Sequence, residues 1–191
     1  MNIIPPRPYT ENSEHSLPWH THFIGQHMQH NYWLYAIVDR VMAANPQLRS
    51  IVELGTGAGA LTTVFGLWGI KRDMPVLTID NVVRHDTKML SALKVRFCQL
   101  DIFSDEAACE MESCIGGAPT WLFCDGGWKG KELLTYAQTL PKGSIISAHD
   151  LGTEFKHDYH AGKLCDEGVI EVYQTDWWME NNIQLALYKK T

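Results

Sequence analysis

Residues 51–62 read Ile-Val-Glu-Leu-Gly-Thr-Gly-Ala-Gly-Ala-Leu-Thr, an apolar run followed by three closely spaced glycines. This order predicts a buried strand, a tight turn and the start of a helix. The chain must turn sharply after the strand, and Gly55, Gly57 and Gly59 let a ligand approach the backbone because no Cβ is in the way. The stretch therefore predicts an α/β fold with a nucleotide-type cofactor held against this turn.

Glu53 decides between two kinds of cofactor. Gly55, Gly57 and Ala60 also fit the dinucleotide fingerprint, with alanine at its third position. A dinucleotide places a doubly charged pyrophosphate at the helix N-terminus, and an acid two residues before the first glycine would repel it. The same acid would attract a cation. We therefore expect a positively charged cofactor, with a nicotinamide-dependent oxidoreductase that uses the glycines and Asp80 as the alternative.

The pattern Glu53-x-Gly55-x-Gly57-x-Gly59 resembles motif I of the class I S-adenosylmethionine-dependent methyltransferases. That resemblance implies S-adenosylmethionine as the cofactor, contacted by the acid and glycines of the motif and by Thr56. It also implies a Rossmann-like α/β sandwich, in which a mostly parallel seven-stranded sheet ends in an antiparallel hairpin. A second alternative has the same fold and binds the cofactor without catalysing a reaction.

Length and composition set limits on the protein's class. The chain has 191 residues, 45% of them hydrophobic, which suffices for one packed domain but not for two of ordinary size. The net charge of -6, with scattered Lys and Arg, argues against a nucleic-acid partner. The five cysteines form no CxxC pair, and no stretch resembles a signal peptide or a membrane span. We expect a cytoplasmic, single-domain protein that acts on a small molecule.

Short apolar runs alternate with helical patterns along most of the chain, which predicts a parallel sheet with helices on both faces. Residues 1–44 are expected to form a proline-rich arm and a lid helix from about residue 21, and residues 45–191 the methyltransferase domain. Strands are expected at 51–54, 76–79, 95–99, 120–124, 144–148, 169–173 and 183–188. Helices are expected between them, at about 60–69, 86–93, 105–114 and 130–139.

Acids follow several of these strands, and in an open parallel sheet ligands bind beyond the carboxyl ends of the strands. Asp80 ends the second strand, where a carboxylate can accept both ribose hydroxyls of a nucleoside, and Asn81 beside it is assigned to the same site. The resemblance implies that Asp101, after the third strand, accepts the adenine amino group. The alternative for Asp101 is a cap of the next helix, a role for which Ser104 competes.

A second group of polar residues follows the fourth and fifth strands. Asp125, His149 and Asp150 should converge at the lip of the sheet because these two strands are expected to be neighbours. The arrangement resembles the cation-dependent O-methyltransferases, which include catechol O-methyltransferase and the cephalosporin-hydroxylase-like group. It implies a divalent metal, Mg²⁺ or Mn²⁺ first, although an imidazole among carboxylates suits Mn²⁺, Fe²⁺ or Zn²⁺ better. The alternative is that Asp125 only orients ligands and Asp150 caps a loop, without a metal.

The match to the catechol enzyme is partial. Its pattern after the fourth strand is Asp-x-Trp-Lys, whereas residues 125–129 read Asp-Gly-Gly-Trp-Lys and contain one residue more. After the fifth strand that family has Asp-Asn, where this chain has His149 and Asp150. The first departure affects the reach of the lysine, and the second affects the choice of metal.

The resemblance assigns catalytic roles to Asp125 and Lys129 in a metal-assisted methylation of a small-molecule hydroxyl. Lys129 is the expected general base, because burial beside a metal disfavours a charged amine. Lys131 is its substitute, and a solvated Lys129 in the loop is the alternative. Trp128 is expected to pack against the cofactor or the acceptor, with burial in the core as the alternative.

The segment before residue 44 is rich in histidines and aromatic residues. No cysteine or acid completes a familiar zinc motif there, so we expect a lid that lines the acceptor pocket. Trp177 and Trp178, in the last hairpin, would meet this lid from the other side. The alternative is that these aromatic side chains pack against a second copy of the chain in a homodimer. The histidines of the segment are His15, His20, His22, His27 and His30.

Overall fold

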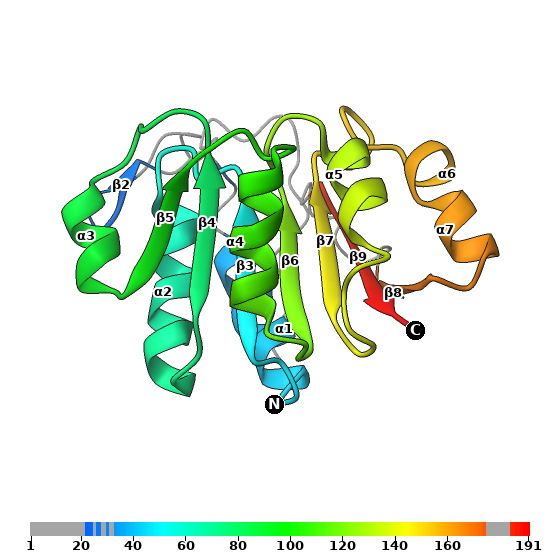
Figure 1. Cartoon of the computed structure of the whole chain (residues 1–191), viewed down its shortest axis with the longest axis horizontal. Coiled ribbons are helices and arrows are strands. Elements are labelled where there is room, and N and C mark those ends of the chain that lie inside the picture. The colour runs from blue at the N-terminus through cyan, green and yellow to red at the C-terminus, as the bar shows by residue number, and fades with distance from the viewer. Residues whose placement is uncertain (1–21, 25, 28–29, 31–32, 175–183) are drawn as a thin grey trace, which may run out of the picture.

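The computed structural model describes residues 22–24, 26, 27, 30, 33–174 and 184–191. Most of the described strands form one seven-stranded sheet in the order β5-β4-β3-β6-β7-β9-β8 (Figure 1). The strands of this sheet are β3 (Ser50–Leu54), β4 (Val76–Asp80), β5 (Val95–Gln99), β6 (Thr120–Cys124), β7 (Ile145–His149), β8 (Ile170–Gln174) and β9 (Leu185–Lys190).

Five neighbouring strands of the sheet, from β5 to β7, are parallel, and β9 runs antiparallel to both β7 and β8. The predicted sheet with its antiparallel hairpin is thus confirmed. The chain winds outward from β3 to β5 and then returns to place β6 on the other side of β3. The carboxyl ends of β3 and β6 therefore form the point where the strand order reverses, which is where open α/β sheets bind their ligands.

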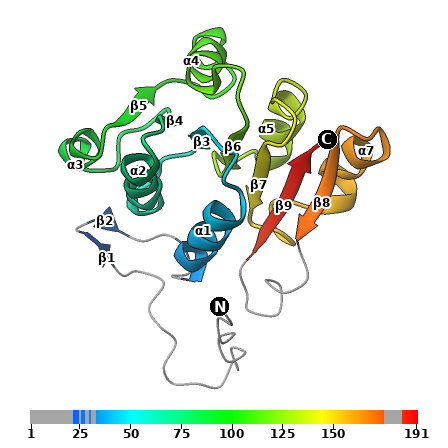
Figure 2. The same cartoon turned by 90° about the horizontal axis from the view of Figure 1, so that it is seen from below.

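Helices cover both faces of the sheet (Figure 2). One face carries α1 (Trp33–Ala44), α2 (Ala60–Arg72) and α3 (Thr87–Ala92), and the other carries α4 (Asp105–Ile115), α5 (Lys129–Tyr136), α6 (His157–His160) and α7 (Gly162–Asp166). Successive residues of a strand point to opposite faces, so Ile51 packs with the first group of helices and Val52 with the second. Both residues are fully buried, which explains why β3 reads as a continuous apolar run.

The structure corrects the predictions at two places. The helix expected from about residue 21 begins only at Trp33, and β1 (His22–Phe23) and β2 (Gln26–His27) form a small antiparallel pair before it. The short helices α6 and α7 between β7 and β8 were not predicted. One side of α1, which includes Val38 and Met42, lies in the core. The helix α1 therefore belongs to the layer that covers the sheet.

Several predictions concern residues outside the described part of the chain. These are the proline-rich arm of residues 1–18, the two tryptophans at 177 and 178, and the histidines at 15 and 20. Among the described residues, no helix combines the length and the apolar character needed to cross a membrane.

Candidate functional site

Two loops meet at the point where the strand order reverses. Gly55 follows β3 with a φ of +93°, and a Cβ at this position would lie 2.3 Å from the carbonyl oxygen of Asp125, which follows β6. Gly59 has a φ of +84° and precedes the first residue of α2. Glycine is required at both positions by backbone conformation, and at Gly55 also by the close approach of a second backbone. The predicted glycine turn therefore lies directly beside the predicted acid at the end of β6.

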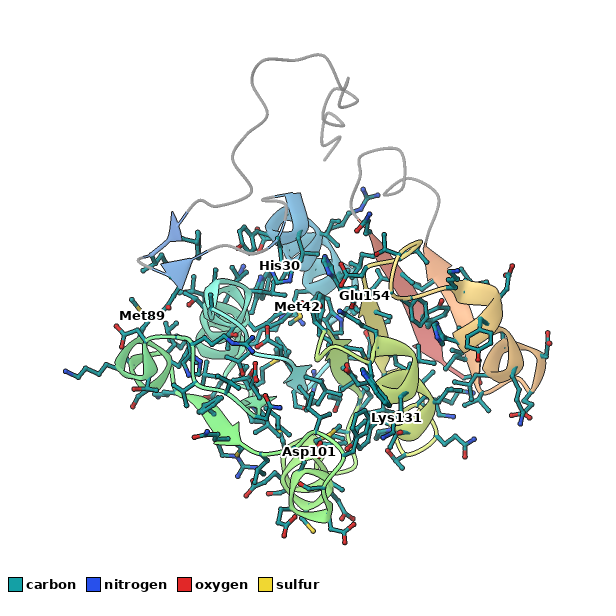
Figure 3. All side chains as sticks on the ribbon, turned by 90° about the horizontal axis from the view of Figure 1, so that it is seen from above. His30, Met42, Met89, Asp101, Lys131 and Glu154 are labelled. Atoms are coloured by element: carbon teal, nitrogen blue, oxygen red, sulfur yellow. The ribbon has the colours of Figure 1, made fainter. Side chains whose placement is uncertain are left out.

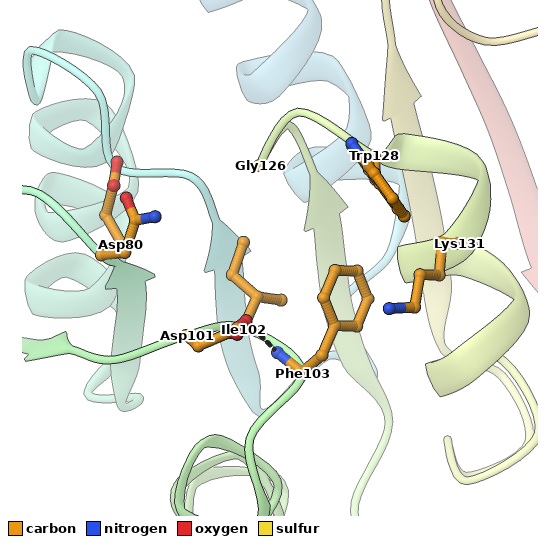
Figure 4. A pocket seen from close by; sticks show the side chains of 8 residues that line it. Asp80, Asp101, Ile102, Phe103, Gly126, Trp128 and Lys131 are labelled. Atoms are coloured by element: carbon orange, nitrogen blue, oxygen red, sulfur yellow. Dashed lines mark hydrogen bonds between the residues drawn. The ribbon is translucent and has the colours of Figure 1, made fainter.

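A cavity of about 310 Å³ opens beside this turn, at the carboxyl ends of the strands (Figure 4). Its walls include Asp80, Asn81 and Asp101, which were all assigned to the cofactor from the sequence. The carboxylate of Asp80 accepts hydrogen bonds from the backbone N–H groups of Gly57 and Val82, both at 3.0 Å. These bonds hold the carboxylate between the glycine turn and the end of β4. The remaining lining residues are Ile102, Phe103, Gly126, Trp128 and Lys131.

Asp101 does not cap the helix that follows it. The hydroxyl of Ser104 caps α4 by accepting a hydrogen bond from the N–H of Ala107, whereas the Asp101 carboxylate accepts one from the N–H of Phe103 at 2.9 Å. The side chain of Asp101 is exposed at the cavity wall, so the alternative that treated it as a helix cap is wrong. The carboxylate is accessible to a ligand.

Trp128 lies at the opposite wall of the cavity, where it is 68% exposed. The alternative of core burial is therefore wrong. The ammonium of Lys131 lies 3.7 Å from the ring centroid of Phe103 and 5.3 Å from that of Trp128. Lys131 thus faces the cavity and its aromatic walls.

Glu53 is 1% exposed and points away from solvent, toward α2. Its carboxylate accepts hydrogen bonds from the hydroxyls of Thr62 and Thr78, at 2.5 and 2.7 Å. Burial raises the pKa of Glu53 to about 8, because it disfavours the charged form more than the two hydroxyls favour it. Near neutral pH the neutral acid is the main form, so the attraction to a cation that we inferred from the sequence is weaker than expected.

The loop after β6 is held by an acid that the sequence reasoning missed. Glu132 of α5 is fully buried and accepts hydrogen bonds from the N–H groups of Gly126 and Trp128. Burial raises the pKa of Glu132 to about 7, against the effect of these bonds. A Cβ on Gly126 would lie 2.1 Å from Ile102 and 2.8 Å from Glu132. An acid in the first turns of a helix after a glycine-containing loop was the available signal.

A cluster of histidines and carboxylates lies next to this loop. The Nε2 atom of His30 is 2.7 Å from Oδ2 of Asp125, and the Nδ1 atom of His149 is 3.5 Å from its Oδ1. His149 Nδ1 also lies 3.0 Å from Oδ1 of Asp150. Figure 3 looks onto the carboxyl ends of the parallel strands and shows that His30 approaches from the side of α1. The structure thus brings together the three predicted metal ligands and adds a histidine.

One ligand atom from each of His30, Asp125 and His149 lies within 4.8 Å of the others, a spacing compatible with a shared metal ion. Asp150 is adjacent to this set but is not a member of it among the described residues. The backbone of Asp150 has a φ of +58°, which an aspartate tolerates better than most residues. This conformation turns its carboxylate toward His149 and Lys129.

Lys129 is 5% exposed and reaches three carboxylates. Its Nζ atom lies 2.5 Å from Glu154, 2.7 Å from Asp150 and 3.6 Å from Asp125. Burial would lower the pKa of Lys129, but the hydrogen bonds to Asp150 and Glu154 outweigh it and raise the pKa above its ordinary value. The prediction of a disfavoured ammonium combined burial with a neighbouring metal; the carboxylates outweigh the burial, and the effect of a metal stays a prediction. Glu154 was missed because it follows the strand by five residues, in a loop without a recognisable pattern.

The same contacts set the charges of the cluster. Burial acts to raise the pKa of Asp125, yet the hydrogen bonds from His149 and His30 dominate and hold it well below its usual range. Burial would lower the pKa of His149, and the carboxylates of Asp125 and Asp150 instead raise it to about 9. Asp125 is therefore a carboxylate in this site, which is the state that a metal ligand or an electrostatic partner requires.

The strand order, the antiparallel last hairpin and the glycine turn beside the acid-lined cavity together define the class I methyltransferase fold, and this chain has that fold. Among solved structures, cmcI with Mg and SAM is similar, with a TM-score of 0.65 and 18% identity over 90% of this chain and 76% of that chain. A methyltransferase from Geobacter sulfurreducens has a TM-score of 0.59 and 14% identity, over 84% and 79% of the two chains. The O-methyltransferase TomG from Streptomyces achromogenes, in complex with SAM, has a TM-score of 0.54 and 15% identity, over 84% and 81%.

At the level of sequence, the chain matches no protein-family profile, and no curated protein matches it. The similarity to the solved structures therefore concerns the fold, and the function has to be argued from the residues of the site.

Proposed function

We propose that this protein is an S-adenosylmethionine-dependent methyltransferase that methylates a hydroxyl group of a small molecule with the help of a divalent metal. One observation carries the proposal: the loop after β6 contributes to both candidate sites. Asp125 belongs to the histidine and carboxylate cluster, and Gly126, the next residue, lines the cavity beside the glycine turn. A cofactor in the cavity and an acceptor at the cluster would thus be neighbours, as group transfer requires.

The cavity fits the adenosine part of the cofactor. The Asp80 carboxylate stands at its edge and can accept the ribose hydroxyls, and the exposed carboxylate of Asp101 can accept the adenine amino group. Ile102 and Trp128 supply apolar surface for the base. The N–H of Gly57 donates a hydrogen bond to the Asp80 carboxylate, which places the glycine turn next to this cavity.

The cluster fits a divalent metal. The imidazole of His149 lies between the carboxylates of Asp125 and Asp150, at 3.5 and 3.0 Å. A bound metal would act as a Lewis acid and lower the pKa of an acceptor hydroxyl. Asp125, His149 and Asp150 would hold it, and alignment of acceptor and cofactor could lower the barrier by roughly 7–11 kcal/mol.

The surroundings of Lys129 differ most from what the sequence predicted for a general base. A general base must be neutral, and three carboxylates around Lys129 favour the ammonium form. Lys129 would accept the acceptor's proton only as the neutral amine, a form that a cation held beside these carboxylates would favour. The proposed catalytic role of Lys129 depends on that neutral form.

The similar structures support the same function. TomG is an O-methyltransferase in complex with SAM, and the cmcI structure contains Mg and SAM. We further propose a cytoplasmic location, a small-molecule acceptor and no nucleic-acid partner, on the composition of the sequence. We also propose that the aromatic residues near the N-terminus pack against a second copy of the chain in a homodimer.

The first test is calorimetric titration of the metal-stripped protein with S-adenosylmethionine and, separately, with NADH. Binding of the first ligand should be lost or strongly weakened in Asp80→Asn and unchanged in Asp73→Asn, a matched substitution at the C-terminus of α2. Binding of NADH alone would return the oxidoreductase alternative.

The second test follows S-adenosylhomocysteine formation across a set of hydroxylated acceptors, with Mn²⁺ or Mg²⁺ and without metal. Turnover that needs the metal supports the complete proposal. Cofactor binding without turnover on any acceptor would instead support a binding domain without catalysis, and turnover without metal would remove the metal from the mechanism.

A further inference from the structure

His30 is the part of the cluster that neither the glycine motif nor the strand ends explain. It precedes α1, whereas Asp125 follows β6 and His149 ends β7, so three separate parts of the chain meet here. His30 Nε2 lies 2.7 Å from the Asp125 carboxylate, and the rings of His30 and His149 meet edge to face with centroids 4.8 Å apart. The side chains of His30, Asp125 and His149 are 13%, 14% and 16% exposed. The three groups are thus largely shielded from water.

We propose that His30 is a metal ligand, and that it completes a set of two imidazoles and one carboxylate with His149 and Asp125. Such a set selects Mn²⁺, Fe²⁺, Co²⁺ or Zn²⁺ over Mg²⁺. This inference rests on the metal half of the proposed function and names the class of metal that the site takes.

Ligand chemistry gives the reason for this selectivity. Mg²⁺ prefers oxygen ligands in a near-ideal octahedron and is rarely bound by imidazole nitrogens. Imidazole suits the first-row transition metals, and two histidines with one carboxylate is a recurrent set for them. The sequence placed a single histidine, His149, among carboxylates. His30 adds a second imidazole to the ligand set, which makes it less like the all-oxygen set that favours Mg²⁺.

The neighbouring charges leave Asp125 available for this role. Lys129 makes its two short contacts with Asp150 and Glu154, at 2.7 and 2.5 Å, and reaches Asp125 only at 3.6 Å. His30 makes the shortest of these side-chain contacts to Asp125, at 2.7 Å, while His149 and Lys129 lie at 3.5 and 3.6 Å.

A simpler explanation for the same geometry is an ion pair or hydrogen bond, in which His30 only contacts Asp125 and binds no metal. The two explanations differ in what they predict for added metal. If His30 is only an ion-pair partner, replacing it leaves the nitrogen ligands of a bound metal unchanged, whereas replacing a ligand changes both the affinity and the preference among dications.

The test is calorimetric titration of the full chain, stripped of metal and without S-adenosylmethionine, with Mn²⁺ and with Mg²⁺. Co²⁺ provides a second readout, because its visible absorption changes with the number, type and geometry of its ligands. The variants are His30→Ala, which removes the imidazole, and His30→Asp, which replaces it by an oxygen ligand. His157→Ala is the matched control, since His157 contacts Tyr188 and lies outside the cluster.

We expect the unmodified protein to bind Mn²⁺ at least about 10-fold more tightly than Mg²⁺. In His30→Ala, Mn²⁺ affinity should fall by at least roughly 100-fold, because even residues that only orient a ligand cost 10–100-fold when replaced. In His30→Asp the ratio of the two affinities should shift toward Mg²⁺ and the Co²⁺ absorption should weaken. His157→Ala should behave as the unmodified protein.

Two results would overturn the inference. If metal binds but His30→Ala keeps the affinities and the Co²⁺ spectrum unchanged, His30 is not a ligand, although a metal-assisted methyltransferase still stands. If no dication binds while S-adenosylmethionine does, both this inference and the metal half of the proposed function fail, and a metal-independent methyltransferase remains.

Discussion

The substitution Glu53→Gln tests whether the buried Glu53 has a raised pKa in the folded protein. Glu53 is buried at the end of β3, and both threonine hydroxyls that contact it bond to its Oε2 atom. Burial raises the pKa of this acid to about 8 in the folded protein, from a value of 4.5 for the unperturbed group. Glutamine has nearly the same shape, can accept the same two hydrogen bonds and never carries a charge.

The sign of the effect follows from proton binding. Between pH 4.5 and 8 the folded protein holds a proton on Glu53 that the unfolded chain has released. Stability from this group is complete below pH 4.5 and is lost as the pH rises through about 8. Each pH unit in that window costs about 1.4 kcal/mol, so the loss is about 3 kcal/mol at pH 7. The glutamine variant does not have this loss.

We therefore expect the free energy of unfolding of Glu53→Gln, minus that of the unmodified protein, to grow with pH by about 3 kcal/mol between pH 4.5 and 7. The measurement is urea denaturation of the ligand-free protein at intervals across that range. Other titrating groups are present in both proteins and cancel in the difference. Glu112→Gln, on the exposed side of α4, is the control and should show no such trend. A difference that stays constant with pH would refute the reasoning about Glu53.

Three further predictions concern the turn, the cavity and the core. Gly55→Ala should lower the free energy of unfolding by at least roughly 2 kcal/mol in a thermal melt, because the new Cβ would meet the backbone of Asp125. Gly162→Ala is the control and should be nearly neutral, because the nearest contact of its Cβ is at 4.0 Å. Asp80→Asn should weaken S-adenosylmethionine binding by at least roughly 10-fold in calorimetry. It should also lower the melting temperature, because the amide oxygen can accept only one of the two backbone N–H bonds that the carboxylate oxygens accept. Equal affinity would remove Asp80 from the site. The ring of Phe65 is fully buried and contacts the rings of Trp121 and Phe123. Phe65→Ala should therefore lower the free energy of unfolding, measured by urea denaturation, by about 3–5 kcal/mol. A loss under 1 kcal/mol would contradict the described core.

The sequence predicted the fold well because its signals are local. An apolar run such as residues 120–124 is buried on both faces, and a helix follows nearly every such run, so the alternation is visible without any knowledge of long-range contacts. The same reasoning failed for α6 and α7. These helices have four and five residues, too few to show a helical period.

The candidate site was predicted in part for a related reason. Asp80, Asp101, Asp125 and His149 could be found because the end of a parallel strand is also a place in the fold, so position in sequence predicts position in space. His30, Glu132 and Glu154 lie on a segment before α1, on a helix and in a loop. Nothing in their local sequence says which strand end they approach.

The sequence by itself determined the order of strands and helices, the glycine turn and the side of the sheet on which its acids gather, because each depends on neighbouring residues. Only the tertiary structure decided the charge states of the site. Glu53 favours its neutral form because α2 covers it, and Lys129 its charged form because Asp150 and Glu154 fold back onto it. It also brought His30 to Asp125 across 95 positions of the chain. Burial and long-range contacts determine the free energy of ionising a side chain, and neither can be predicted from the residues next to it in the sequence.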